Sequence, residues 1–128
     1  HLDPLETLEQ AVIREVMEET AHDFTPHALV GMYMSRYTSK RRGTDVTYLR
    51  FTFCGEAGKE YDQPLDHGIL RTLWMTRDEM VACQDRHRSP IVLRCVDDYL
   101  AGKRTALDLL HTHESVFEHG LTLKTDVT

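Results

Sequence analysis

The chain has too few cysteines, basic residues and long apolar runs for several classes of protein. Its three cysteines lack the paired short spacing of a zinc site or a disulfide framework, which favours reduced thiols in a cytoplasmic protein. No apolar run approaches the ~20 residues that span a bilayer and no signal peptide is visible, so we expect no membrane partner. The net charge of −6 argues against nucleic acid as the main partner, because phosphate binding needs a basic surface.

What is present fits one globular domain. The 128 residues, 41% of them apolar, are enough for a hydrophobic core. We place the domain at residues 1–110 and a weakly patterned tail at residues 111–128. The chain lacks an initiator methionine and opens abruptly at His1. We therefore expect that an amino-terminal segment is missing from it.

Apolar periodicity and turn-forming residues predict a mixture of helices and strands. A helix over residues 6–19 begins with a capping box made by Thr7 and Gln10. After it we expect a turn at 24–26, strands at 28–35 and 46–54 joined by a hairpin loop at 38–45, a loop at 55–68 and a short strand at 69–74. The strand at 46–54 alternates and should be half-buried. Two more helices begin after Thr76 and Ser89, and the second ends at Gly102.

The first helix carries an unusual arrangement of charge. Glu15, Glu18 and Glu19 stand at i, i+3 and i+4 on one face. Like charges at this spacing destabilise a helix by roughly 0.2–0.5 kcal/mol per pair, whereas three carboxylates on one face suit a hard divalent cation. Arg14 lies eight residues after Glu6, about two turns, so its guanidinium can hold a carboxylate in position. The alternative is a solvated acidic helix without a ligand.

The order of these residues resembles the Nudix box of the Nudix hydrolases. The matching positions are six, spread over fourteen residues: Glu6, Arg14-Glu15, the apolar Val16, and Glu18-Glu19. Three positions depart from the box. Its opening glycine would precede His1, Ala21 stands where the box has glycine, and His22 replaces an apolar residue. If position 21 is left-handed, alanine there costs roughly 1–2 kcal/mol.

The remainder of the chain resembles a narrower group, the bacterial NudJ-type phosphatases. The individual positions are weak signals, but their joint order and spacing are moderately specific. They are Leu49-Arg50-Phe51, Gln63-Pro64, Asp66, Ile69, Trp74, Arg88-Ser89-Pro90, Tyr99, Gly102, Arg104 and Leu107.

The resemblance implies both a fold and an activity. The fold is of the α/β (α+β) class, an α/β/α sandwich around a mixed sheet, and we expect the strands that precede the box to be missing from this chain. The activity is hydrolysis of the phosphoanhydride bonds of nucleoside tri- or diphosphates, or of a related small-molecule diphosphate, with Mg²⁺ and with Mn²⁺ as a substitute. We expect a monomer or a homodimer. Two alternatives are a non-catalytic Nudix-fold module that binds a nucleotide and regulates a partner, and a Nudix-fold isomerase.

The same resemblance assigns roles to residues. Glu15 is our first choice for the base that activates water, and Glu15, Glu18 and Glu19 are the expected metal ligands. Arg14 belongs to the catalytic set, and Glu6 supports the box. A second carboxylate from a distant loop often assists in the family; Asp66 is the candidate, with Glu56 and Glu60 as alternatives. Arg50, on the polar face of a strand, binds substrate phosphate or makes a surface ion pair.

Other residues favour a structural interpretation. We expect the basic tip at residues 40–42 to be solvated, and His111, His113 and His119 to be structural or exposed rather than metal ligands. Trp74 should lie in the core, with base stacking as the alternative. The cysteines should be small buried apolar groups, because none has a histidine at a spacing that indicates a nucleophile.

Overall fold

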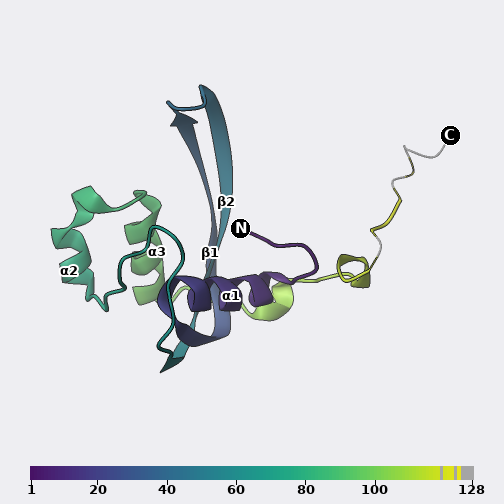
Figure 1. The fold of residues 1–128 in the computed structure, drawn as a ribbon, viewed down its shortest axis with the longest axis horizontal. Coiled ribbons are helices and arrows are strands. Elements are labelled where there is room, and N and C mark those ends of the chain that lie inside the picture. The colour runs from purple at the N-terminus through teal and green to yellow at the C-terminus, as the bar shows by residue number, and fades with distance from the viewer. Residues whose placement is uncertain (119, 123, 125–128) are drawn as a thin grey trace.

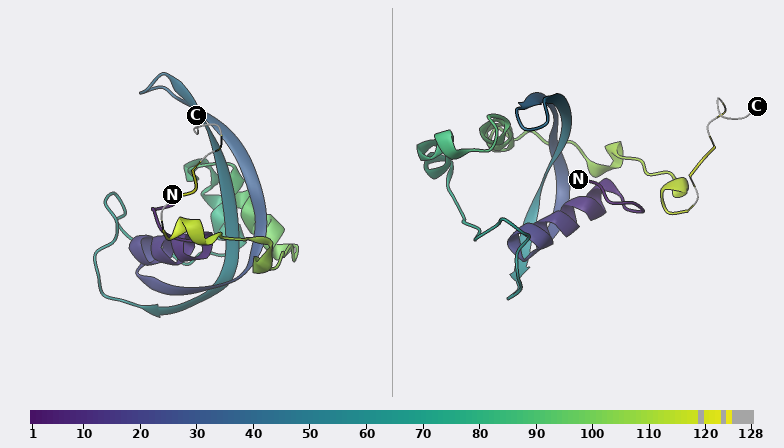
Figure 2. Two further views of the ribbon diagram at one scale, coloured as in Figure 1. Left: turned by 90° about the vertical axis from the view of Figure 1, so that its right-hand side faces the viewer. Right: turned by 45° about the horizontal axis from the view of Figure 1, so that its top comes forward.

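A long two-stranded hairpin organises the fold. The computed structural model describes residues 1–118, 120–122 and 124, and it contains the elements α1 (Leu8–Thr20), β1 (His22–Ser39), β2 (Thr44–Glu60), α2 (Arg77–Ala82) and α3 (Ile91–Leu100). A short 3-10 helix lies between α2 and α3 at Gln84–Arg86, and two more follow α3 at Leu107–Leu109 and Glu114–Val116. The antiparallel ribbon of β1 and β2 runs the height of the molecule, α1 crosses it, and α2 and α3 lie along another side (Figures 1 and 2).

The ribbon is longer than the sequence patterns predict. The predicted strands lie inside β1 and β2, but the predicted turn at 24–26 and the loop assignment for residues 55–60 are wrong, because these two segments pair with each other. Pro26 donates no ladder hydrogen bond, and the register shifts between Pro26 and Ala28. A Cβ on the opposing Gly55 would lie 2.0 Å from the carbonyl oxygen of Thr25, so glycine permits this close pairing.

α1 begins and ends as its sequence predicts. Thr7 Oγ1 accepts a hydrogen bond from Gln10 N at 3.0 Å, and Gln10 Oε1 accepts one from Thr7 N at 2.9 Å, so the capping box is confirmed. Ala21 caps the carboxyl end in the left-handed region, with φ 57° and ψ 28°. The alanine at the glycine position of the box therefore occupies a backbone conformation that glycine adopts more easily.

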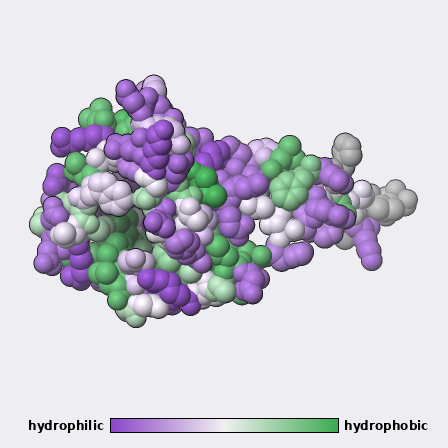
Figure 3. Space-filling view, turned by 90° about the horizontal axis from the view of Figure 1, so that it is seen from below, coloured by the Kyte–Doolittle hydropathy of each residue, from purple (hydrophilic) through white to green (hydrophobic). Residues whose placement is uncertain are grey.

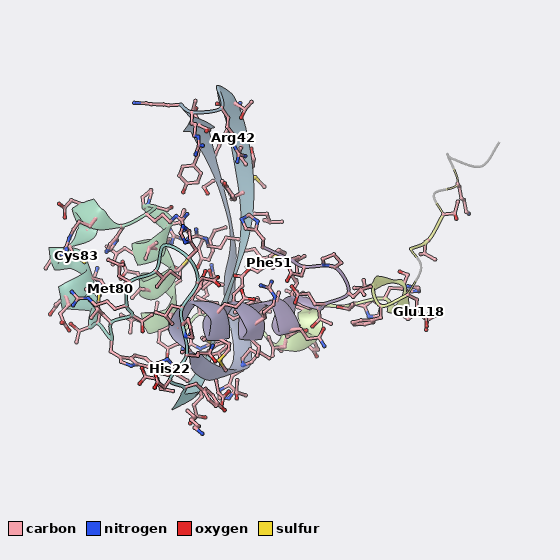
Figure 4. The ribbon with its side chains drawn as sticks, in the orientation of Figure 1. His22, Arg42, Phe51, Met80, Cys83 and Glu118 are labelled. Atoms are coloured by element: carbon pink, nitrogen blue, oxygen red, sulfur yellow. The ribbon has the colours of Figure 1, made fainter. Side chains whose placement is uncertain are left out.

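The histidine that follows Ala21 fits its apolar position. His22 is buried, and its Nδ1 lies 2.7 Å from the carbonyl oxygen of Thr20. The ring of His22 packs edge-on against Trp74, with 5.8 Å between ring centroids. A buried ring nitrogen that has a carbonyl partner carries a small desolvation cost. The end of α1 is therefore intact despite the two departures from the box, and Figure 4 shows His22 at this end.

Three side-chain contacts join α3, and the segment just before it, to the ribbon. Tyr33 Oη donates to Asp98 Oδ2 at 2.6 Å, the hydroxyls of Tyr37 and Ser89 bond to each other, and Thr52 Oγ1 lies 3.2 Å from Cys95 Sγ. The two helices predicted for this region are present, but the N-cap of α3 is Pro90 and not Ser89 as the sequence predicts. The capping box of Thr76 and Glu79 opens α2, the Ser89 hydroxyl accepts from Ile91 N at the start of α3, and Gly102, with φ 84°, follows its end.

The outer ribbon and the segment before α2 are more exposed than predicted. The short strand at 69–74 is wrong, because these residues have no regular structure. The core prediction for Trp74 is also wrong, since its side chain is 79% exposed. The half-buried alternation of β2 fails at Leu49, which is 58% exposed, because the ribbon there extends past the helices (Figure 1). Arg42 lies at the far tip of the ribbon, away from α1 (Figure 4), and residues 40–42 are solvated as predicted.

The core is small and lies where the helices meet the inner ribbon. Leu29 is 1% and Val30 is 2% exposed, and Ala11 of α1 is buried near them in the fold. Figure 3 shows apolar side chains gathered around a hollow on the underside. A cavity of about 300 Å³ opens between the ribbon and α3, lined by both ribbon strands and by Cys95 and Val96. Among the described residues no helix is long and apolar enough to cross a membrane.

The thiols partly match their prediction. Cys54 and Cys95 are buried, whereas Cys83 is half-buried, and all three are free. Cys83 has a histidine nearby, since its Sγ lies 3.9 Å from His87 Nε2, four residues further along the chain. That no cysteine acts as a nucleophile stays a prediction. Figure 4 places Cys83 on the outer side of α2, remote from α1.

Backbone hydrogen bonds join the segment after α3 to the ribbon. Thr105 exchanges two backbone hydrogen bonds with Leu29, both at 2.8 Å. His111 and His113 are exposed, as expected, and His113 Nδ1 accepts from Ser115 N at 3.1 Å. His119, and the ends of the predicted tail at 123 and 125–128, lie outside the described residues. The boundary between domain and tail at residue 110 stays a prediction.

Replacing Ala21 by glycine should stabilise the protein. The left-handed backbone at Ala21 costs an L-residue about 1–2 kcal/mol, part of which the greater freedom of glycine in the unfolded chain cancels. We expect Ala21→Gly to raise the free energy of unfolding by about 0.5–1 kcal/mol in urea titrations, with an unchanged m-value.

The matched control is Ala101→Gly. Ala101 caps α3 with φ −73°, an ordinary right-handed conformation. Glycine there relieves no strain and should leave stability unchanged or lower it. Equal effects of the two substitutions would contradict the strain at Ala21.

Candidate metal and phosphate site on α1

A bidentate ion pair organises the helix. Arg14 Nη2 donates to Glu6 Oε1 at 2.8 Å, and Arg14 Nε donates to Glu6 Oε2 at 3.1 Å. The Glu6 side chain is only 12% exposed. Two parallel N–H···O bonds fix the guanidinium as well as attract it. The hydrogen bond from Arg14 lowers the pKa of Glu6, and the bond to Glu6 raises the pKa of Arg14.

The same guanidinium reaches the acidic face of α1, which we define as Glu15, Glu18 and Glu19. Arg14 Nη1 donates to Glu18 Oε2 at 3.0 Å, and Arg14 Nη2 lies 3.8 Å from Glu15 Oε1. Arg14 therefore bonds to one carboxylate of the acidic face and lies near a second. Arg14 is placed to orient these carboxylates as well as Glu6.

Glu19 is the third carboxylate and has a different environment. Its pKa is raised, first by burial and then by the negative charges of Glu15 and Asp66, and the positive charge of Arg88 opposes the rise. Glu19 is exposed, and negative charge gathers around it. Carboxylates placed together in this way are suitable donors for a divalent cation. The acidic face is not closed around a common point, because no group of three His, Cys, Asp or Glu in the described residues has the spacing of a metal cluster.

The loop that carries Asp66 docks on the end of α1. Asp66 N donates to the Glu18 carbonyl oxygen at 2.9 Å, and Gln63 Nε2 donates to the Met17 carbonyl oxygen at 3.4 Å. Both carbonyls belong to the end of the helix, and the Met17 carbonyl also accepts from Ala21 N at 2.9 Å. The backbone therefore brings Asp66, about 45 residues further along the chain, beside Glu19.

The two alternatives to Asp66 lie elsewhere. Glu56 pairs with Thr25 in the ribbon, so it is not in a loop. Glu60 ends β2, and its Oε2 lies 4.0 Å from His22 Nε2. Of the three distal carboxylates weighed from the sequence, Asp66 is the one that the structure places against the acidic face.

Arg50 lies on β2, opposite Tyr33 in the ladder, and is exposed. Within the described residues it makes no ion pair, so the surface ion pair expected as its alternative role is not formed there. Its charge contributes to a lowered pKa of Tyr37, after the hydrogen bonds with Ser35 and Ser89. The structure does not bring Arg50 into contact with the acidic face.

Arg88 is the residue that sequence reasoning missed as part of this site. It is exposed, and it directly precedes the buried Ser89. Its charge is close enough to Glu19 to oppose the rise in the pKa of that carboxyl. The signal in the sequence was the Arg88-Ser89-Pro90 segment of the resemblance, which carries no indication of where the arginine lies.

Comparison with known proteins assigns the chain to a family. The NUDIX domain model matches residues 1–95, which include α1, both ribbon strands, α2 and the first half of α3. The chain belongs to the Nudix family. It is 29% identical over 122 residues to the Phosphatase NudJ of Escherichia coli K12 and to that of Shigella flexneri, which covers 94% of this chain and 76% of each relative. It also resembles the solved NUDIX hydrolase from Nitrosomonas europaea, with 47% identity, a TM-score of 0.78, and coverage of 88% of this chain and 74% of that one.

These matches confirm the predicted family, its α/β Nudix fold and a Nudix hydrolase that acts on acid anhydrides. The NudJ-like resemblance is likewise confirmed. In the described residues the sheet is a two-stranded antiparallel ribbon, where the sequence predicted a mixed sheet. Nudix proteins generally use divalent metal ions. That the acidic face binds one in this chain stays a prediction.

Replacing Arg14 by lysine tests the bidentate pair. Lysine keeps the charge but loses the planar fork that joins Glu6 to Glu18. Because groups that orient metal ligands typically contribute 10–100-fold in metal affinity or activity, we expect Arg14→Lys to lower metal-dependent hydrolysis by about 10-fold or more. Activity and Mn²⁺ affinity are measured together.

The matched control is Arg36→Lys. Arg36 pairs with Asp45 near the exposed end of the ribbon, so its substitution should leave both quantities unchanged. A loss of the same size in both variants would contradict a specific role for Arg14.

Proposed function

We propose that this protein is a Mg²⁺-dependent hydrolase of nucleoside tri- or diphosphates, or of a related small-molecule diphosphate, with Mn²⁺ as a substitute metal. The single observation that carries the proposal is the bidentate Arg14–Glu6 pair, which arranges the charged residues of the box on one helix. The relatives support the chemical class, since they are named as a phosphatase and a hydrolase. Glu15, Glu18 and Glu19 are the proposed metal ligands.

Each side chain has a proposed role in the reaction. A bound divalent cation neutralises charge on the phosphate oxygens and makes water more acidic. Glu15 accepts the proton from the attacking water, whose oxygen bonds to phosphorus as the bridging P–O bond breaks and the leaving phosphate carries away the electron pair. Asp66, held beside Glu19 by the loop on α1, aligns that water. Arg50 contacts substrate phosphate from the ribbon.

We also propose the class of substrate, the cellular location and the oligomeric state of the protein. A chain of net charge −6 repels nucleic acid and anionic membranes, so we propose small molecules as its only substrates. Three free thiols fit the reducing cytoplasm, where we place the protein. We retain the prediction of a monomer or a homodimer.

A second function is a non-catalytic module that binds a nucleotide and regulates a partner. Such a module has no need for the metal-binding carboxylates, yet this chain keeps Glu15, Glu18 and Glu19 as well as the arginine that holds them. Catalysis is therefore the function that the site supports best. An isomerase of the same fold has no supporting observation.

The decisive experiment is phosphate release from a panel of nucleoside tri- and diphosphates and small-molecule diphosphates. We expect turnover with Mg²⁺ that EDTA abolishes and added Mg²⁺ restores. Glu18→Gln and Glu19→Gln should each lower kcat by at least about 100-fold, because each removes a charged ligand from the metal while keeping side-chain volume.

The matched control is Glu9→Gln, which removes a carboxylate from the first turn of α1, outside the acidic face. It should retain full activity. Unchanged turnover in both acidic-face variants, or activity that survives chelation, would sink the catalytic proposal. Nucleotide binding without turnover would favour the regulatory module.

A further inference from the structure

A stretch of exposed apolar side chains lies between the loop on α1 and the start of α2. We call residues 69–75 the apolar segment. It has no regular secondary structure, and its large exposed side chains are Leu70, Leu73, Trp74 and Met75. Both ends of the segment are held in place. At one end Ile69 N donates to the Asp66 carbonyl oxygen at 3.0 Å, and at the other Thr76 caps α2.

Trp74 lies against the carboxyl end of α1. Its ring packs on the ring of His22 with 5.8 Å between centroids and 90° between planes. His22 Nδ1 in turn lies 2.7 Å from the carbonyl oxygen of Thr20, the last residue of α1, which adjoins Glu19. The loop with Asp66 is bonded to the same end of the helix. Direct contacts therefore join the indole to the helical turn that carries part of the acidic face (Figure 4 shows His22 at this end).

The contact with His22 leaves most of the indole free. Trp74 is 79% exposed, although a tryptophan side chain usually buries more apolar area than other side chains do. Exposed apolar patches of this kind mark binding sites in soluble proteins. A second copy of this chain is a poor occupant, because the nearby acidic face and a net charge of −6 on each copy repel it. The surroundings suit a planar ligand that brings a cation with it.

We propose that Trp74 is the stacking surface for the base of the substrate, so that the substrate is a nucleoside di- or triphosphate rather than an aliphatic diphosphate. The inference rests on the proposed function, because the acidic face must hold the metal and the phosphates for the base to meet Trp74. Every nucleobase has a planar face that stacks on an aromatic ring. Ribose and phosphate separate the base from the reacting phosphorus, so a base-binding residue belongs beside the metal-binding carboxylates and not among them.

The first test uses the fluorescence of Trp74, which is the only tryptophan in the chain. The ligands are the α,β-methylene analogues of adenosine and cytidine diphosphate, which cannot be hydrolysed at that bridge, and methylenediphosphonate, which has the same bridge and no base. Excitation is at the red edge of indole absorption, where the bases absorb little, and Mg²⁺ is present. We expect both nucleotide analogues to quench the emission saturably, and methylenediphosphonate to leave it unchanged.

The second test compares the wild type with Trp74→Leu, Trp74→Phe and the control Leu70→Ala, a 97% exposed residue of the same segment. Loss of one stacked base corresponds to about 5- to 100-fold in affinity. By calorimetry, Trp74→Leu should weaken binding of the nucleotide analogues by this factor and leave the affinity for methylenediphosphonate unchanged. With adenosine diphosphate as substrate, KM should rise and kcat change far less. Trp74→Phe should keep part of the affinity, and Leu70→Ala should behave as the wild type.

The outcomes separate the inference from the proposed function. If the wild type hydrolyses nucleotides and Trp74→Leu binds the analogues equally well, or loses affinity for both kinds of ligand alike, the inference is overturned and the proposed function stands. If the wild type hydrolyses nothing, the proposed function fails, and unchanged emission on addition of the analogues overturns the inference as well. The emission of a buried indole before any ligand is added would show that protein covers Trp74, which also overturns it.

Discussion

The site depends on the pairing of Arg14 with Glu6. Three carboxylates on one helical face repel each other, and the guanidinium that Glu6 holds is the charge that offsets them within α1. The bidentate geometry matters more than the charge, because it fixes where the remaining donor of Arg14 meets Glu18. A helix that carries such a concentration of acid therefore has one basic residue that offsets part of it.

The rest of the structure brings other elements to this helix. The loop with Asp66 reaches it through a backbone hydrogen bond from Asp66 to the Glu18 carbonyl and a side-chain bond from Gln63 to the Met17 carbonyl. Arg50 lies on the ribbon without contacting the acidic face, and the tyrosines of β1 hold α3 and the segment that precedes it. Negative charge on α1 and positive charge on the ribbon side together suit a ligand that itself joins metal and phosphate.

Local chemistry was predictable from the sequence and long-range pairing was not. Both capping boxes and the end of α3 at Gly102 follow from residues three or four positions apart, and the structure has them. The box register identified the family for the same reason. The lengths of β1 and β2 depend on each strand finding the other, which allowed Pro26 and Gly55 to pair where local rules predict a turn and a loop. The exposure of Trp74 and the place of Arg88 depend on tertiary contacts, on which the local pattern is silent.

The central claim is that the acidic face of α1 holds a divalent cation with Asp66 nearby. Paramagnetic broadening of backbone amide resonances by Mn²⁺ tests it most directly, because the effect falls steeply with distance from the ion. We expect substoichiometric Mn²⁺ to broaden the amides of residues 15–20, 63 and 65–67 first, and excess Mg²⁺ to reverse this. Broadening centred on His111 and His113, or spread evenly over the exposed acidic residues, would contradict it.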